Sequence, residues 1–492
     1  MDAEGLTRRE ALALGLVGAA ALTLSACSDG ASPSATTATT TSRPDGASAR
    51  RVVVVGAGLA GLTAALDLVD AGWDVVVLEA RSRVGGRVHT VRRPFSDGVH
   101  AEAGGESIDD DHDRLLAMLR RFHIPTEQRP PDKILQGLTS WHGTRAKTSR
   151  FVAGRGGKVA ADYERFYDAL DDLSADVDPV HPERLPGAEH HDARSLAEFT
   201  DDLHLVPEAR FLVDTDNRGE FNAEPHEVSL LFAMQQAAVG ESVEDSSIES
   251  MRVKGGNDRL PRAMAAALGD RVRLERPVTR VEHRASGVRV TAGSTTIDAA
   301  WLVLACPLTP LREVIFDPPL PASVAATVAG LDLGHAAKVT LEYDERFWEQ
   351  QDLSGFTVTD LPFGIAWSPT DSYASTPGLL TAFITGDGAR AAARQSDRER
   401  VAAVRSQFAE VYPGSTPLLT GNQATTAWAN ERFTGGGYAV HQPGQFLRFW
   451  PVLRAGTGRI RFAGEHTETL AGYMESAVRS GHRVARELGA PR

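Results

Sequence analysis

The chain has 492 residues, of which 42% are hydrophobic and 24% charged, an ordinary composition for a soluble globular protein of two or three domains. Its net charge of −13 argues against nucleic acid as a partner and would at most weakly attract cations. Two cysteines, Cys27 and Cys306, cannot form a disulfide framework.

Residues 1–27 have the pattern of an export signal. The pair Arg8-Arg9 precedes an apolar segment, 11–26, that is too short to span a bilayer. The segment ends in Leu-Ser-Ala-Cys27, which resembles a bacterial lipobox, so we expect Cys27 to be lipidated; the alternative is a secretory signal cut nearby. Residues 28–49, rich in Ser, Thr and Pro, are expected to form a disordered tether. This pattern predicts folded export by the twin-arginine route, to the outer face of the bacterial cytoplasmic membrane, the periplasm or the exterior.

Residues 51–79 have the pattern of a strand, a glycine-rich turn, a helix and a second strand. The strands are β-branched runs, and the helix shows apolar periodicity. The turn is Gly56-Ala57-Gly58-Leu59-Ala60-Gly61. One glycine permits the tight turn, one lets a pyrophosphate approach the backbone, and one lets the helix lie close to the sheet. Glu79 ends the second strand, where a carboxylate can accept the hydroxyls of an adenosine ribose, so the pattern predicts a dinucleotide site rather than a merely tight turn.

The residues after Glu79 extend this pattern with cations and glycines, Ala80-Arg81-Ser82-Arg83-Val84-Gly85-Gly86-Arg87. This segment resembles the FAD motif of the flavin-containing amine oxidase superfamily, which includes monoamine, polyamine and L-amino acid oxidases. The alternative for the arginines is a solvated basic loop. The resemblance implies a mixed α/β (α+β) fold, in which a Rossmann-like FAD-binding domain is interleaved with a substrate domain of antiparallel sheet plus helices.

The resemblance covers roughly 51–488 and implies a division of the chain into segments. The FAD-binding domain is expected from 50–115, 249–310 and 421–492. A helical substrate-domain insertion is expected at 116–248, and a substrate domain with an antiparallel sheet at 311–420.

Residues 100–107 are similar to the family segment whose backbone passes beside the flavin ring, His100-Ala101-Glu102-Ala103-Gly104-Gly105-Glu106-Ser107. In L-amino acid oxidases this segment carries an arginine for the substrate carboxylate; Ser107 occupies that position and weakens the amino-acid interpretation. The acidic run 109–113 is interpreted as the opening of a helix over 114–122, whose free N–H groups its carboxylates would satisfy. His190-His191-Asp192 is expected in a solvated turn, and no metal site is predicted.

The apolar strand 336–343 resembles the family strand whose lysine is linked through a water to flavin N5. A buried lysine must find a partner or lose its proton, so Lys338 is expected to bond such a water, the alternative being a side chain that extends to solvent. By the same resemblance Val278 contacts the adenine. Cys306 is expected to be a small core residue, because no His or Asp pattern surrounds it.

The C-terminal motifs, 434–438 and 459–477, closely resemble those of amine oxidases. There, Tyr438 and Tyr473 would flank the amine in front of the flavin, whereas isolated tyrosines would be core residues. Gly464 and Glu465 would bind the phosphate-ribityl region, and a helix beginning near Met474 would point its amides at the flavin. Monoamine oxidases have a flavin-bonded cysteine where this chain has Gly437, so FAD is expected to be non-covalent.

The resemblance therefore implies an FAD-dependent amine oxidase that transfers hydride to flavin N5, with oxygen giving an imine, then aldehyde and ammonia, and hydrogen peroxide. The expected partners are a small-molecule amine, oxygen and, through Cys27, a membrane surface. Open alternatives are an L-amino acid oxidase, a flavoenzyme like the desaturases or protoporphyrinogen oxidase, and a non-catalytic flavoprotein. The predicted catalytic residues are Lys338, Trp428, Tyr438 and Tyr473. The predicted cofactor-binding residues are Gly56, Ala57, Gly58, Ala60, Gly61, Glu79, Ala80, Arg81, Gly86, Arg87, Ala103, Gly104, Gly105, Glu106, Val278, Gly464, Glu465, Tyr473, Met474 and Ala477.

Overall fold

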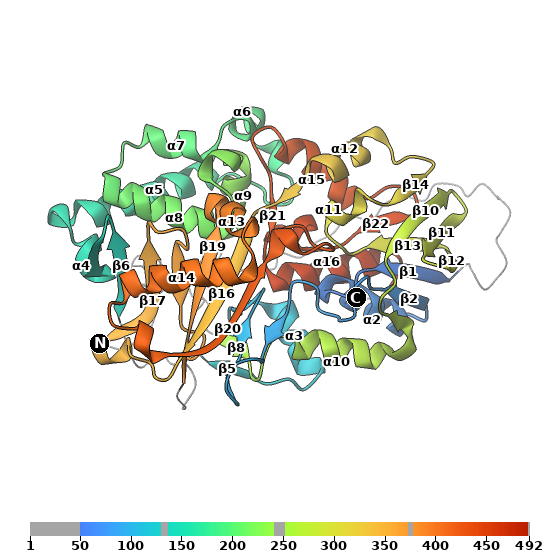
Figure 1. Cartoon of the computed structure of the whole chain (residues 1–492). Helices are drawn as coiled ribbons and strands as arrows, with labels where there is room; N and C mark the ends of the chain where they lie inside the picture. The colour runs from blue at the N-terminus through green and yellow to red at the C-terminus, as the bar shows by residue number, and fades with distance from the viewer. Residues whose placement is uncertain (1–49, 129–135, 241–250, 372–376, 491–492) are drawn as a thin grey trace.

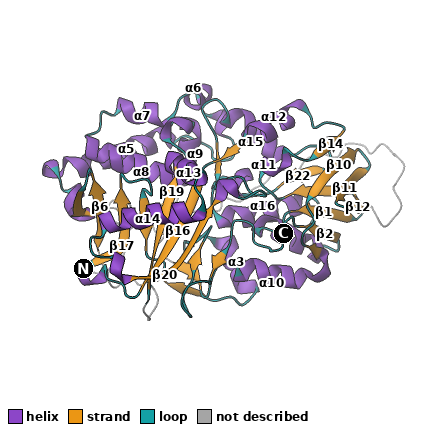
Figure 2. Ribbon diagram, viewed as in Figure 1, coloured by secondary structure: helices purple, strands orange, loops and turns teal. Residues whose placement is uncertain are grey.

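A computed structural model describes residues 50–128, 136–240, 251–371 and 377–490 (Figure 1). The predicted signal, the tether and Cys27 lie outside the described residues. Within the described part, no helix is both long and apolar enough to cross a membrane. Strands and helices are mixed throughout, and the strands gather into separate sheets in the two halves of the molecule (Figure 2). The predicted mixed α/β fold is confirmed.

A five-stranded parallel sheet forms the first half, in the order β22-β13-β1-β2-β9. Its strands come from three separated parts of the chain: β1 (Arg51–Val55), β2 (Asp74–Leu78), β9 (Val272–Arg273), β13 (Trp301–Leu304) and β22 (Ile460–Phe462). Strands β2 and then β9 follow β1 on one side, and β13 and then β22 lie on its other side, so the direction in which strands are added reverses at β1. Ligands of such sheets bind outside the carboxyl ends of the strands at that point.

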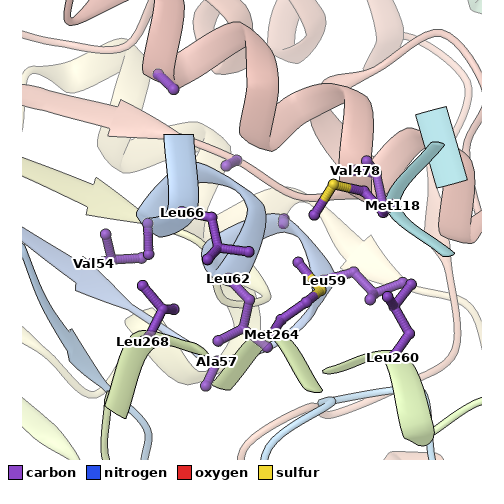
Figure 3. Close-up of a cluster of buried hydrophobic side chains, with 14 of the residues drawn as sticks. Val54, Ala57, Leu59, Leu62, Leu66, Met118, Leu260, Met264, Leu268 and Val478 are labelled. Atoms are coloured by element: carbon purple, nitrogen blue, oxygen red, sulfur yellow. The ribbon is translucent and has the colours of Figure 1, made fainter. Parts of the chain in front are cut away.

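Helices pack on this sheet through one apolar core, drawn in Figure 3. The core joins Val54 of β1 to Leu62 of α2, Met264 of α10 and Val478 of α16. The contributing helices are α2 (Leu59–Asp70), α3 (Asp113–Arg121), α10 (Arg259–Leu268) and α16 (Met474–Glu487). A β-carbon on Gly481 of α16 would lie 2.5 Å from the Ala60 carbonyl, so this glycine allows α16 to lie against α2.

A four-stranded sheet, in the order β12-β11-β10-β14, adjoins the parallel sheet. It contains β10 (Val278–Arg284), β11 (Gly287–Ala292), β12 (Thr295–Ala299) and β14 (Ile315–Asp317). Strand β14 lies beyond 310, where the substrate domain was expected to begin, yet it pairs with β10.

A seven-stranded sheet forms the second half, in the order β20-β16-β19-β18-β17-β6-β7. Its strands are β6 (Gln136–Trp141), β7 (Thr144–Lys147), β16 (Ala336–Tyr343), β17 (Leu353–Thr359), β18 (Ile365–Trp367), β19 (Gly378–Thr385) and β20 (Leu419–Ala427). All neighbours are antiparallel except β17 and β6. Helices α13 (Gly386–Ala393) and α14 (Asp397–Val411) pack against β16 and β20. Every residue of β16 is buried, which places Lys338 inside the protein.

The described residues of the predicted insertion 116–248 are mostly helical, and the helices from 158 to 240 lie together on one side of the second half (Figure 1). They include α5 (Lys158–Ser174), α6 (Ala188–Ala193), α7 (Leu196–Asp202), α8 (Pro207–Phe221) and α9 (Leu230–Gly240). The same segment also supplies β6 and β7 to the seven-stranded sheet. Apart from short 3-10 helices, the remaining described elements are β3 (Thr90–Val91), β4 (Ala101–Glu102), β5 (Thr126–Gln128), β8 (Met251–Val253), β15 (Asp332–Leu333), β21 (Ala439–Val440), α4 (Thr148–Val152), α11 (Leu308–Leu311), α12 (Ala322–Gly330) and α15 (Phe446–Ala455).

The expectation of a solvated turn at His190-His191-Asp192 is wrong. These residues lie in α6, and Asp192 is buried. Its carboxylate accepts hydrogen bonds from the Ser229 hydroxyl at 2.7 Å and from the Phe446 and Leu447 amides at 3.1 Å. A carboxylate can be buried when several donors replace its hydration.

The helix expected at 114–122 is α3, and Asp113 of the acidic run lies in its first turn. The N-cap residue, His112, makes no side-chain hydrogen bond to the helix. Instead Glu475 of α16 accepts from the amides of Arg114 at 3.2 Å and Leu115 at 2.7 Å. In the same acidic run, the side-chain atoms of Asp109, Asp111 and His112 that could bind a metal ion lie within 4.8 Å of one another.

Candidate functional site

A cavity of about 920 Å³ begins at the carboxyl end of β1 and reaches the side chains of β16, β18 and β19 in the other half. This volume lies near the top of the range for small-molecule sites, roughly 300–1,000 Å³. All the predicted catalytic and cofactor-binding residues line it except Ala57 and Gly61, whose neighbours Gly56, Gly58 and Ala60 do line it. Segments from the beginning, middle and end of the chain therefore meet at one cavity.

The glycine-rich turn has the geometry expected of a phosphate cradle. Gly56 has a φ of +106°, and a β-carbon on Gly61 would lie 2.0 Å from the Gly56 carbonyl, so the fold itself requires both glycines. Gly58 differs, because its φ of −79° suits any residue and no protein atom lies within 4 Å of a β-carbon placed there. That space opens on the cavity at the N-terminus of α2, where free N–H groups favour an anion. The cradle fits a pyrophosphate.

Glu79 is held in place by two backbone donors. Its carboxylate accepts from the Ala57 amide at 2.8 Å and the Arg81 amide at 2.9 Å, and the side chain is buried at the cavity wall. A carboxylate has about four acceptor positions, so two remain for hydroxyl groups of a ligand. This arrangement fits the predicted ribose contact.

Two of the three arginines after Glu79, Arg81 and Arg87, bind distant loops, whereas Arg83 donates to the carbonyls of Val84 and Gly86 in its own loop. Arg81 donates to the Thr434 hydroxyl at 2.6 Å. Arg87 donates to the Gly437 carbonyl at 2.5 Å and to Glu465 at 2.7 Å. Burial alone would raise the pKa of Glu465, but the nearby Arg87 guanidinium holds that pKa below its ordinary value.

Glu465 joins the two segments that carry the predicted tyrosines. Besides pairing with Arg87, its carboxylate accepts from the Ala439 amide at 3.3 Å and the Gly472 amide at 2.9 Å. Tyr438 precedes the first of these amides and Tyr473 follows the second. One buried charge thus fixes the backbone beside both rings.

The segment 103–106 passes between Trp428 and the N-terminus of α16. A β-carbon on Gly104 would lie 1.7 Å from the Arg87 carbonyl, and one on Gly105 would lie 3.1 Å from Met474. Trp428 donates its indole N–H to the Ala103 carbonyl at 2.8 Å. Trp428 therefore contacts the segment 103–106, which lines the cavity. Gly104 and Gly105 allow this segment to pass close to its neighbours.

Helix α16 presents its N-terminus to the cavity. Tyr473 is its N-cap residue and makes no side-chain hydrogen bond to the helix, and Met474 and Ala477 of the first turn line the cavity. The first N–H groups of a helix have no partners within it and carry a partial positive charge. This end of the cavity therefore favours a group on which negative charge develops.

Both tyrosines line the cavity, and their surroundings hold them in place. A β-carbon on Gly472 would lie 3.0 Å from the Tyr438 ring, so this glycine packs on that ring. The ring of His112 meets Tyr473 edge-on, with centroids 5.7 Å apart. Burial lowers the pKa of His112 to about 4, which leaves it neutral at pH 7.

Lys338 does not extend to solvent, and its partners are protein groups. Its ammonium lies 3.0 Å from a Glu106 carboxylate oxygen, 3.0 Å from the Gly104 carbonyl and 3.2 Å from the Glu102 carbonyl. The expected water is therefore not needed to satisfy it. Sequence reasoning named Glu106 for its backbone alone and missed this carboxylate.

Three further residues around Lys338 were also missed. Trp367 of β18 donates its indole N–H to Glu106 at 3.0 Å, and Lys338 lies 4.8 Å from the centroid of that ring and 5.8 Å from the Phe383 ring. Arg252 of β8 places its Nε 3.8 Å from Glu106. These side chains come from separate strands, and no local motif marks them.

Cys306 lines the cavity just beyond the carboxyl end of β13 and is a free thiol. Burial raises its pKa to about 12, so it stays protonated and unreactive. This agrees with the interpretation of Cys306 as a packing residue rather than a nucleophile.

The profile of the family described as "Flavin containing amine oxidoreductase" matches residues 59–489. A flavin-containing amine oxidase of Danio rerio is 30% identical over 457 residues, which cover 90% of this chain and 86% of the relative. Flavin-containing amine oxidase B of Homo sapiens is 30% identical over 458 residues, covering 89% and 85%.

Solved structures agree with these sequence matches. A wild-type putrescine oxidase bound to putrescine superposes with a TM-score of 0.80 at 28% identity, covering 90% of this chain and 99% of that one. Cyclohexylamine oxidase from Brevibacterium oxydans IH-35A superposes with a TM-score of 0.79 at 25% identity, covering 89% and 98%. Together with the site geometry, these matches establish that the chain belongs to the flavin-containing amine oxidoreductase family, as a flavin-dependent oxidoreductase that acts on amines.

Proposed function

We propose that this enzyme holds FAD without a covalent bond and uses it to oxidise the carbon–nitrogen bond of a small amine. One observation carries the proposal: a single cavity joins the Gly58 cradle and Glu79 to Lys338 and the two tyrosines, Tyr438 and Tyr473. The names of the related proteins support an amine as the substrate, because they include an oxidase of putrescine and one of cyclohexylamine.

FAD suits the cavity better than a mononucleotide flavin. The wall runs from Glu79 and Val278, at the expected adenosine end, past the N-terminus of α2 to Lys338 in the other half. Glu79 has acceptor positions for a ribose and α2 has amides for a pyrophosphate, and both groups occur in a dinucleotide.

Non-covalent binding is favoured by the packing at Gly437. This residue offers no thiol where monoamine oxidases have a flavin-bonded cysteine. A β-carbon at this position would lie 2.5 Å from the Asn222 side-chain oxygen and 3.1 Å from Ala336. A larger side chain would therefore need these neighbours to move.

Bound flavin would supply the hydride acceptor. Tyr438 and Tyr473 would orient the amine and exclude water, and the low-dielectric slot would favour the neutral amine over the ammonium ion. The nitrogen lone pair then assists departure of hydride from the α-carbon, giving an imine. Two electrons and two protons pass in total to oxygen, giving hydrogen peroxide, and water hydrolyses the imine to an aldehyde and, for a primary amine, ammonia.

A simple amine is favoured over an α-amino acid. An amino acid needs a cation for its carboxylate, and Ser107 stands where L-amino acid oxidases carry an arginine. Arg346 lines the cavity, but it already bonds the Glu349 carboxylate at 3.1 Å and the Thr370 carbonyl at 3.2 Å.

Anaerobic mixing of the flavin-loaded enzyme with monoamines, diamines and L-amino acids tests the proposal. We expect amines to bleach the flavin absorbance, and aerobic turnover to release peroxide in proportion to aldehyde. Bleaching by α-amino acids alone would contradict an amine substrate. Bleaching by none of these compounds would contradict oxidation of carbon–nitrogen bonds by this site.

We also propose export by the twin-arginine route and anchoring through a lipid on Cys27. The sequence pattern of residues 1–27 supports this proposal. Fractionation of cells that express the full chain should place the enzyme on the membrane, and Cys27→Ser should release it. A wild-type enzyme found in the cytoplasm would contradict export.

A further inference from the structure

We infer that Glu106 is a positioning residue for this reaction, which keeps Lys338 as an ammonium ion and fixes it at the cavity wall. The family resemblance supplies a lysine at this place but assigns no role to the carboxylate beside it. The kinetic part of the inference rests on the proposed function, whereas the charge pairing does not.

The number of acceptors around Lys338 matches an ammonium ion. The three acceptors are the Glu106 carboxylate and the carbonyls of Gly104 and Glu102, all within 3.2 Å. An ammonium has three N–H donors, whereas a neutral amine has two donors and a lone pair. A neutral Lys338 would leave one acceptor without a donor and bury its lone pair against oxygen, which is unfavourable.

Glu106 is held as an anion by Trp367 and Arg252 as well as by Lys338. Trp367 donates to one of its oxygens, and Arg252 lies close to the same oxygen. Burial would raise the pKa of Glu106, but the Lys338 and Arg252 cations hold it below its ordinary value. Because Arg252 also pairs with Asp371 at 3.2 Å, opposite charges alternate from Lys338 to Asp371.

The other titratable groups nearby do not replace Glu106. Burial raises the pKa of Glu102 to about 7, so this group is mostly charged at pH 8, but its side chain bonds Thr90 and the backbone amide of Asn257 rather than Lys338. Burial lowers the pKa of His100 to about 4, so this ring is neutral at pH 7. Glu106 is therefore the carboxylate that balances the charge of Lys338.

This pairing has a consequence for the chemistry of the site. An ammonium ion whose three donors are engaged cannot accept a proton from the substrate. Lys338 therefore acts as a fixed positive charge at the cavity wall and not as the base that deprotonates the amine. The neutral pair also avoids an unbalanced positive charge that would repel a cationic substrate.

The test compares Glu106→Gln with Glu102→Gln, which removes an equally buried carboxyl group that does not bond Lys338. Reductive methylation reacts only with neutral amines, and mass spectrometry of the flavin-loaded protein measures its rate at each lysine, with exposed Lys254 as the internal standard. We expect at least tenfold faster modification of Lys338 in Glu106→Gln, at pH 8, and wild-type protection in Glu102→Gln. Equal protection of Lys338 in a folded Glu106→Gln protein would overturn the inference.

A second variant keeps the test decisive if Glu106→Gln does not fold. Glu106→Asp retains the charge but shortens the side chain, so it should keep Lys338 protected and leave the pH profile of flavin reduction unchanged. Its kcat should fall several-fold while KM stays within twofold, because Lys338 is displaced but still charged. A pH profile displaced by a unit or more would overturn the inference. Since methylation needs no substrate, its result stands apart from any failure of the proposed amine oxidation.

Discussion

The substitution Gly58→Ala should weaken flavin binding without lowering the stability of the fold. Gly58 has a φ of −79° and a ψ of −179°, which alanine adopts without strain, and no protein atom lies within 4 Å of the added methyl group. Replacing glycine by alanine at a compatible position restricts the unfolded chain and stabilises a protein by about 0.4–1 kcal/mol. We therefore expect the flavin-free variant to be as stable as the wild type or slightly more stable.

The same methyl group should weaken flavin binding. It would enter the space between the N-terminus of α2 and the cavity, and push a pyrophosphate away from the backbone amides. A hydrogen bond to a charged group is worth about 1.5–3 kcal/mol, so loss of one corresponds to a rise in Kd of about 10- to 150-fold. Titration of flavin-free protein with FAD, followed by flavin fluorescence, measures this Kd, and urea unfolding measures stability.

Gly61→Ala is the matched control. Its methyl group would lie 2.0 Å from the Gly56 carbonyl, so the helix must move away from the strand. Overpacking of this kind costs about 1–3 kcal/mol, which should appear as loss of stability in the flavin-free protein. If Gly58→Ala binds FAD as tightly as the wild type, the space at Gly58 is not the pyrophosphate cradle.

Two further predictions concern pH and the cofactor linkage. Burial raises the pKa of Glu102 from its ordinary 4.5 to about 7, so the folded protein holds a proton that the unfolded chain releases between these values. The free energy of unfolding should therefore fall by up to about 3 kcal/mol as pH rises through this interval. The Glu102→Gln variant should show a smaller fall. An equal dependence of the unfolding free energy on pH in both proteins would disprove the role of Glu102. Acid precipitation of the holoenzyme should release free FAD, because Gly437 offers no thiol; flavin absorbance that stays with the polypeptide would disprove non-covalent binding.

The sequence by itself determined the local elements that carry the site. The β-branched runs of β1 and β2, the glycine turn and Glu79 were all predicted, because strand periodicity and turn chemistry are local properties. The lysine strand β16 and the start of α16 were predicted from the resemblance of their motifs to those of the family. Nearly every residue named in these predictions lines the same cavity.

Only the tertiary structure decided how the buried charges are paired. Lys338 and Glu106 are 232 residues apart, Trp367 and Glu106 261 apart, and Glu475 caps a helix 360 residues earlier. The sequence around Asp192 predicted a solvated turn, yet Asp192 is buried and its carboxylate accepts hydrogen bonds from three distant donors. A charge can be buried only where partners from elsewhere in the chain replace its hydration, and hydrophobic periodicity carries no information about those partners.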